Sequence, residues 1–185
     1  IPFHVRRHLS RALDIPSSKI RVIKPRIGGG FGGKQTACVE IFTALVTLKT
    51  GKPAKIIYDR KETFTCTTTR HAMRLNVKVG ADKEGNIKVI DINALSDTGA
   101  YGEHASTTFG LVGEKTLPIY GKLKASRFKG NVVYTNKTPA GALRGYGATQ
   151  GCFAVESTIN KLAAKLNMDP VDIRLKNIIK EGETS

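Results

Sequence analysis

The sequence has little of what marks secreted or membrane-bound proteins. It contains no Trp and only three cysteines, Cys38, Cys66 and Cys152, in 185 residues. These are too few and too far apart for a disulfide framework or a zinc site, so a reducing compartment, the cytoplasm, is expected. No apolar run is long enough for a signal peptide or a membrane span, and no membrane partner is expected.

Acidic residues are also scarce. The chain has 15 Asp and Glu against 30 Lys and Arg, a formal net charge of +15. Such a charge suits a polyanion. However, the basic residues are scattered, aromatics make up only 6% of the chain, and no expected helix combines a continuous basic face with stacking residues. A solvated surface or a contact with acidic segments explains the charge as well, so no nucleic-acid partner is expected.

The length is sufficient for one core, and residues 1–185 are expected to form a single domain. The chain begins "IPFHVRR" without Met, so we expect a segment of a longer soluble polypeptide.

A glycine-rich stretch, "RIGGGFGGKQ", is the strongest local motif. Gly28, Gly33 and Lys34 have the spacing of a P-loop, but Gln35 stands where that site needs a Ser or Thr to ligate magnesium. The glycines also fit a dinucleotide fingerprint, yet the acidic residue due about 20 positions on is displaced to Asp59. A nucleotide-binding module without redox activity therefore stays open as an alternative.

Hydrophobic spacing predicts the elements around this motif. A helix is expected near residues 5–13, a strand at 20–24, a helix opened by the glycine loop and capped by Gly51, and a strand at 53–59. The strand, glycine loop, helix and strand would then form a parallel pair with a right-handed crossover.

The rest of the chain predicts a different architecture. Residues 73–96 alternate on both sides of a turn at 82–86, which is typical of an antiparallel hairpin, and a strand is expected at 127–134. Two helices should follow, the second with Asp169 as cap and Pro170 as first residue. The predicted fold class is α/β, in a mixed α+β arrangement: a mixed sheet with a strand–glycine loop–helix unit, an antiparallel hairpin and C-terminal helices.

A second glycine-rich loop, "TPAGALRGYGATQG", precedes the first of these C-terminal helices. Each glycine loop carries an aromatic residue and a cation. Two such loops, each opening a helix, suggest a long anionic ligand held at several points by backbone amides and helix N-termini.

Four motifs together carry a family resemblance. "RIGGGFGGKQ", "DTGAYGEH", "ALRGYGATQ" and "MDPVDIRLKNIIKEGE", in this order, resemble the molybdenum-binding large subunit of the xanthine dehydrogenase and aldehyde oxidase family, in its bacterial xanthine dehydrogenase type. The resemblance implies a partial molybdopterin-binding domain of a molybdenum hydroxylase. It also implies oxidation of a purine-like N-heterocycle, of the xanthine or hypoxanthine class, at an electron-poor carbon with water-derived oxygen. An aldehyde or a nicotinate-type heterocycle is the alternative substrate.

The resemblance also implies the cofactors and partners. Molybdopterin, with the cytosine dinucleotide form as one option, would carry the molybdenum, while iron-sulfur clusters and FAD would reside on other modules or subunits. The family's catalytic glutamate belongs to a downstream motif, so no catalytic residue and no protein ligand to a metal is expected here, and Glu114 in "LVGEKT" is interpreted as a surface acid. These 185 residues alone are expected to be inactive and to associate as a symmetric homodimer through exposed surfaces.

Cofactor-binding residues follow from the resemblance. The backbone amides around Gly30, Phe31 and Gly32 are expected to face the cofactor, because glycines let the backbone approach closely. Arg144 matches the family arginine that contacts the pterin, and its guanidinium suits a phosphate or a polarised oxygen.

Gln35 and Tyr146 match substrate-pocket positions. Gln35 can offer both a donor and an acceptor, and Tyr146 can stack on a flat ring. The vertebrate-type pocket has a further arginine between the hairpin and the next strand, which this chain lacks. His104, Glu103 or Lys115 would have to orient a purine in its place.

Overall fold

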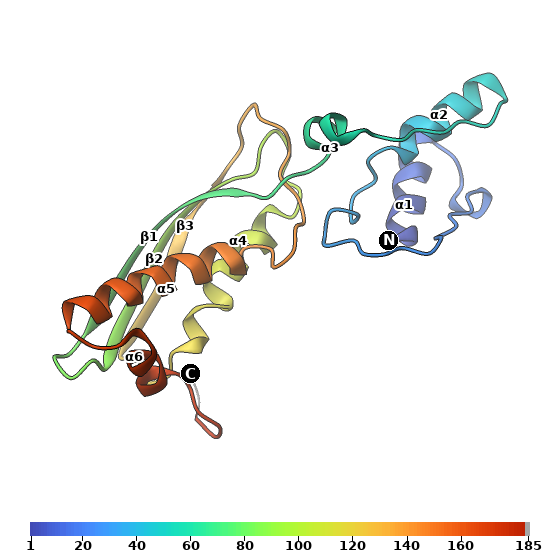
Figure 1. The fold of residues 1–185 in the computed structure, drawn as a ribbon. Helices are drawn as coiled ribbons and strands as arrows, with labels where there is room; N and C mark the ends of the chain where they lie inside the picture. Colours follow the sequence, from blue (N-terminus) through green and yellow to red (C-terminus); the bar gives the residue numbers. More distant parts are fainter. Residues whose placement is uncertain (184–185) are drawn as a thin grey trace.

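The first helices form a lobe of their own at the N-terminal side of the molecule (Figure 1). The computed structural model describes residues 1–183. Helix α1 (Pro2–Leu13) buries Val5 and Leu9 and packs against α2 (Glu40–Thr50), and a short 3-10 helix, η1 (Ser17–Lys19), follows α1. Helix α2 ends at Gly51, whose φ of 69° gives the left-handed cap that the sequence predicts.

A three-stranded sheet forms the centre of the larger lobe. Strands β1 (Ala72–Ala81) and β2 (Ile87–Asp97) are antiparallel, as expected for a hairpin. The Asp82 carboxylate accepts a hydrogen bond from the Asn86 amide in the turn between them. Strand β3 (Ala125–Val133) lies on the other side of β2 and runs parallel to it, so the order is β1-β2-β3.

Helices cover one face of this sheet (Figure 1). Helix α4 (Ala105–Glu114) and the 3-10 helix η2 (Leu117–Ile119) lie in the crossover from β2 to β3, and α5 (Ala148–Lys165) contacts both β1 and α4. Helix α6 (Pro170–Asn177) packs against α5, and its cap Asp169 accepts from the Val171 amide at 2.6 Å, as its sequence predicts.

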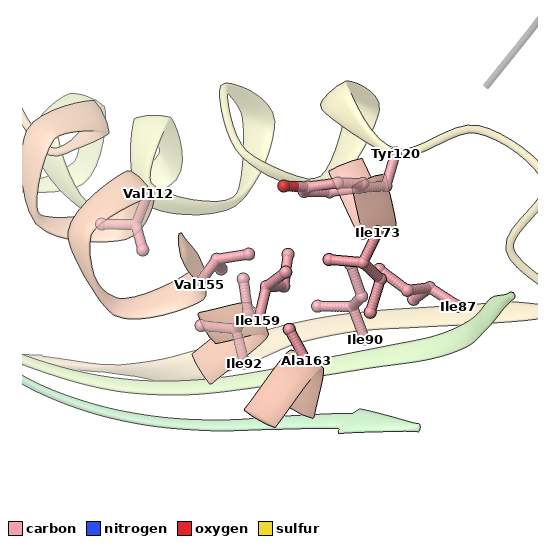
Figure 2. Close-up of a cluster of buried hydrophobic side chains, with 9 residues drawn as sticks. All are labelled: Ile87, Ile90, Ile92, Val112, Tyr120, Val155, Ile159, Ala163 and Ile173. Atoms are coloured by element: carbon pink, nitrogen blue, oxygen red, sulfur yellow. The ribbon is translucent and has the colours of Figure 1, made fainter. Parts of the chain in front are cut away.

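The core lies between the sheet and these helices. Figure 2 shows side chains from β2, α4, α5 and α6 directed toward one another. The buried cluster consists of Ile87, Ile90, Ile92, Val112, Tyr120, Val155, Ile159, Ala163 and Ile173. The Tyr120 hydroxyl donates to Glu156 at 2.7 Å, so the one polar group that this cluster buries is satisfied.

Two expected strands are absent from the described residues. Segments 20–24 and 53–59 are extended without strand pairing, so the predicted strand–glycine loop–helix–strand unit is wrong. A strand needs a partner for its backbone groups, and neither segment has one, which leaves Ile23 and Ile57 largely exposed. The parallel pair is instead β2 with β3, connected through α4.

The fold class is nevertheless confirmed, because helices and a mixed three-stranded sheet make up the structure. Two helices were not expected from the sequence: α3 (Arg60–Cys66), which leads from the N-terminal lobe toward β1, and α4. Within residues 1–183, no helix combines the length and apolar character that a membrane crossing requires.

Candidate functional site: two apposed glycine loops

The two glycine-rich loops lie against each other. We call residues 28–35 the first loop and residues 141–147 the second loop. The Arg144 amide donates to the Phe31 carbonyl at 2.8 Å. A Cβ on Gly32 would come within 2.9 Å of the backbone of Ala142 and Leu143, and the φ of Gly32 is 88°. Only glycine at position 32 allows the two backbones to meet in this way.

The first loop presents free amides. Phe31 is left-handed, with φ 49°, and its ring is 65% exposed. The Lys34 ammonium donates back to the Gly29 carbonyl at 2.7 Å, and the Gln35 amide donates to Gly32. Within residues 1–183, the amides of residues 30–32 have no hydrogen-bond acceptor, so they can receive one from a ligand.

The expectation that the first loop opens a helix is wrong. Helix α2 begins at Glu40, and its N-cap is Val39 rather than a residue of the loop. A P-loop places its lysine at the start of a helix, whereas Lys34 is turned onto its own loop. The loop therefore offers amides without the potential of a helix N-terminus.

The second loop does open a helix, as expected. Gly147 is the N-cap of α5, and the preceding Gly145 and Tyr146 are left-handed, with φ of 82° and 50°. A Cβ on Gly147 would overlap the Thr108 carbonyl, so α4 packs directly on the start of α5. This contact holds the end of the second loop against α4.

Gln35 and Tyr146 meet where the loops join. The Tyr146 hydroxyl donates to Gln35 Oε1 at 2.9 Å. The His104 ring lies edge-on to Tyr146, with ring centroids 5.6 Å apart, and its Nδ1 is 3.4 Å from the same hydroxyl. Glu103 accepts from the Thr36 hydroxyl and lies 3.8 Å from His104 Nε2. A polar chain thus runs across both loops.

These features suit an acceptor-rich anionic ligand. Among residues 1–183 the amides of residues 30–32 find no acceptor, the Arg144 side chain is exposed, and neither loop contains an acid. Phosphate and pterin oxygens are acceptors of this kind. The donor set therefore fits a phosphorylated pterin.

Residues 1–178 match the family model described as the molybdopterin cofactor-binding domain. The chain belongs to the molybdopterin cofactor-binding domain family. It is 42% identical over 186 residues to the xanthine dehydrogenase molybdenum-binding subunit of Escherichia coli O157:H7, covering all of this chain and 25% of that protein. It is 36% identical over 183 residues to the nicotinate dehydrogenase large molybdopterin subunit of Eubacterium barkeri, covering 98% of this chain and 42% of that protein.

Solved structures agree. The quinoline 2-oxidoreductase of Pseudomonas putida 86 superposes with a TM-score of 0.86 at 30% identity, over 98% of this chain and 23% of that one. The aldehyde oxidoreductase of Desulfovibrio gigas gives a TM-score of 0.80 at 33% identity, over 86% and 17%. The chain spans about a quarter of the length of the xanthine dehydrogenase subunit that it matches.

Arg70, which contacts the second loop, is not predicted by the sequence. The Arg70 guanidinium donates to the carbonyls of Arg144 and Tyr146 at 2.8 and 2.9 Å, and to the side chains of Thr149 and Gln150 at 2.8 and 3.2 Å. These partners lie more than 70 positions away in the sequence. No local pattern around Arg70 indicates such contacts.

The Cys38 thiol and the buried His71 imidazole, both near the loops, are held in their neutral forms. Burial, with the nearby Glu40 and Glu103 charges, raises the pKa of Cys38, so its thiol stays protonated. Burial lowers the pKa of His71, which is therefore neutral at pH 7. Across residues 1–183, no group of three or more His, Cys, Asp or Glu side chains is arranged to hold a metal ion. Glu114 is an exposed residue at the end of α4.

Proposed function

We propose that this chain is part of a molybdenum hydroxylase that oxidises a purine-like N-heterocycle of the xanthine or hypoxanthine class. Family membership supports the reaction type. The observation that supports the substrate class is the Gln35–Tyr146 pair at the junction of the glycine loops. The similarity to a xanthine dehydrogenase subunit over the whole chain points the same way.

Molybdopterin would be held by the amides of Gly30, Phe31 and Gly32 and by Arg144. These amides are unpaired within the described residues, and the exposed Arg144 guanidinium can pair with a phosphate or a pterin oxygen. When bound, the molybdenum centre would supply the replacement of a C–H hydrogen by a hydroxyl group whose oxygen comes from water, with two electrons and two protons released. The cytosine dinucleotide form is part of this proposal.

The substrate would meet Gln35 and Tyr146. Because Gln35 Oε1 already accepts from Tyr146, its amide NH₂ remains free to donate to a ring nitrogen or a carbonyl oxygen of a purine. The Tyr146 ring, held between Gln35 and His104, supplies a flat apolar surface. In line with the family resemblance, we assign the catalytic glutamate to a part of the full protein outside these residues.

The remaining elements of the proposal concern assembly. Two electrons must leave after each turnover, which fits iron-sulfur and flavin modules or subunits as partners. We also propose that residues 1–185 act as one cofactor-binding domain and that a homodimer forms.

The test uses the purified full-length enzyme under anaerobic conditions with an artificial electron-accepting dye. The proposal predicts fast dye reduction with xanthine or hypoxanthine and slow reduction with nicotinate or a simple aldehyde. Preference for nicotinate or the aldehyde would replace the substrate assignment and leave the hydroxylase assignment intact. ATP or NAD binding without any dye reduction would favour a nucleotide-binding module instead.

A further inference from the structure

We propose that Arg70 is a positioning residue that holds the second loop in its substrate-binding conformation and thereby sets substrate affinity. This inference rests on the proposed function of the Gln35–Tyr146 pair. Among the described residues, the hydrogen bonds of Arg70 go to neither the Gln35 nor the Tyr146 side chain; Arg70 holds the backbone that carries Tyr146.

The Arg70 fork bridges both sides of a left-handed turn. Nη2 donates to the Arg144 carbonyl at 2.8 Å and Nη1 to the Tyr146 carbonyl at 2.9 Å. Gly145 and Tyr146, with φ of 82° and 50°, lie within this bridge. A left-handed tyrosine is costly and persists only where its surroundings fix it. The planar guanidinium can satisfy both carbonyls at once, which a lysine cannot do with the same geometry.

The same guanidinium joins the turn to the start of α5. Nη1 also lies 2.8 Å from the Thr149 hydroxyl and 3.2 Å from the Gln150 side-chain oxygen, so its two hydrogens are shared among three acceptors. Gln150 in turn donates to the His71 carbonyl at 3.1 Å, next to Arg70 itself. The contacts therefore close a ring through segment 70–71, the second loop and α5.

The backbone on either side of Arg70 is fixed as well. The Thr69 amide donates to the Pro139 carbonyl, and the Gly141 amide donates to Thr69, a short parallel bridge at the start of the second loop. His71 is buried. The backbone of Arg70 is therefore held on both sides, so its side chain can restrict the conformation of the turn.

The positive charge of Arg70 has no acidic partner among the described residues. In the part of the chain that the structure describes, no Asp or Glu forms an ion pair with Arg70. A cation beside the N-terminus of α5 is electrostatically unfavourable, so the four hydrogen bonds must outweigh this repulsion. The position of Arg70 at the N-terminus of α5 is therefore consistent with a role in holding the turn at residues 144–146.

The experiment compares Arg70→Lys with Arg74→Lys in the full-length enzyme. Arg74 lies on the exposed side of β1 and is the matched control. With Arg70→Lys, we expect the purine KM to rise roughly 10- to 100-fold, as when a group that orients a binding residue is removed. Molybdenum content and Tm should be retained, because Arg144 keeps its backbone contact with Phe31. The control should leave all three unchanged.

A double-mutant cycle separates positioning from a general structural role. In a Tyr146→Ala background, Arg70→Lys should raise KM little further, because the side chain that it positions is gone. Guanidinium ion added to Arg70→Ala should restore part of the lost affinity. Three results would each overturn the inference: an unchanged KM in Arg70→Lys, a full rise in KM that persists in the Tyr146→Ala background, or a rise in KM accompanied by a lower Tm and a loss of molybdenum.

A readout independent of turnover distinguishes this inference from the proposed function. Hydrogen–deuterium exchange of amides 145–150 should be faster in Arg70→Lys than in wild type or in Arg74→Lys. If wild type oxidises no purine but amide exchange in Arg70→Lys rises as expected, the substrate assignment fails and the positioning role stands. If wild type oxidises purines and the exchange is unchanged, the positioning role fails.

Discussion

Gly32→Ala should separate the two glycine loops. The added Cβ would come within 2.9 Å of the backbone of Ala142 and Leu143, closer than real Cβ atoms approach, and the φ of 88° disfavours any side chain. These neighbours are backbone atoms of a loop that is held by hydrogen bonds, so moving them away from the new methyl group costs free energy. Gly28→Ala is the matched control in the same loop, because its Cβ would meet nothing within 4 Å.

The size of the effect follows from these two costs. A left-handed alanine costs about 1–2 kcal/mol. Inserting a methyl group into a packed contact costs about 1–3 kcal/mol. Together they disfavour the apposed arrangement by about 2–5 kcal/mol, which at roughly 1.4 kcal/mol per tenfold lowers its population by a factor of about 25 to several thousand.

The assay measures molybdenum per subunit and dye reduction with a purine in full-length enzyme. Gly32→Ala should lose most of both, while Gly28→Ala should resemble wild type. The reasoning is refuted if Gly32→Ala keeps full molybdenum and turnover, because the loops would then not need to touch.

The remaining predictions concern single side chains. Gln35→Ala should keep molybdenum but lose turnover, because Gln35 is assigned to substrate; loss of metal in proportion to activity would move it to the cofactor. Arg144→Ala should lower molybdenum occupancy, and full occupancy measured by metal analysis would refute its role. Lys137, with Thr135 and the Gly99 amide, lowers the pKa of Asp97 from 3.8 to about 2. The ionised form therefore stabilises the fold above pH 3.8, and this contribution disappears as the pH falls through about 2. Asp97→Asn should thus lower the urea midpoint of the 185-residue chain at pH 7, and the difference from wild type should shrink between pH 4 and 2; a constant difference would contradict this.

Local signals predicted much of the fold. The Asp169–Pro170 start of α6 and the Gly51 end of α2 were readable because caps depend on neighbouring residues. The β1–β2 hairpin was readable because its alternation flanks a turn with Gly85. Segments 20–24 and 53–59 have strand-like composition, but a strand also needs a partner, which composition does not reveal.

The site was predictable only through the family resemblance. The two glycine loops are recognisable in the sequence, but they lie more than 100 positions apart, and nothing local shows that they meet. In the structure Phe31 contacts Arg144 and Gln35 contacts Tyr146. Arg70 was missed because its four acceptors belong to a distant segment. Its role depends on where two carbonyls point, which the residue types do not encode.

The most direct test of the central claim is the molybdenum content of the full-length subunit, produced in cells that make the cofactor. If the apposed glycine loops hold molybdopterin, wild type should contain close to one molybdenum and one pterin per subunit, and Gly32→Ala should contain little of either. Wild-type protein that is folded but free of molybdenum and pterin, or Gly32→Ala with the full complement, would contradict the account.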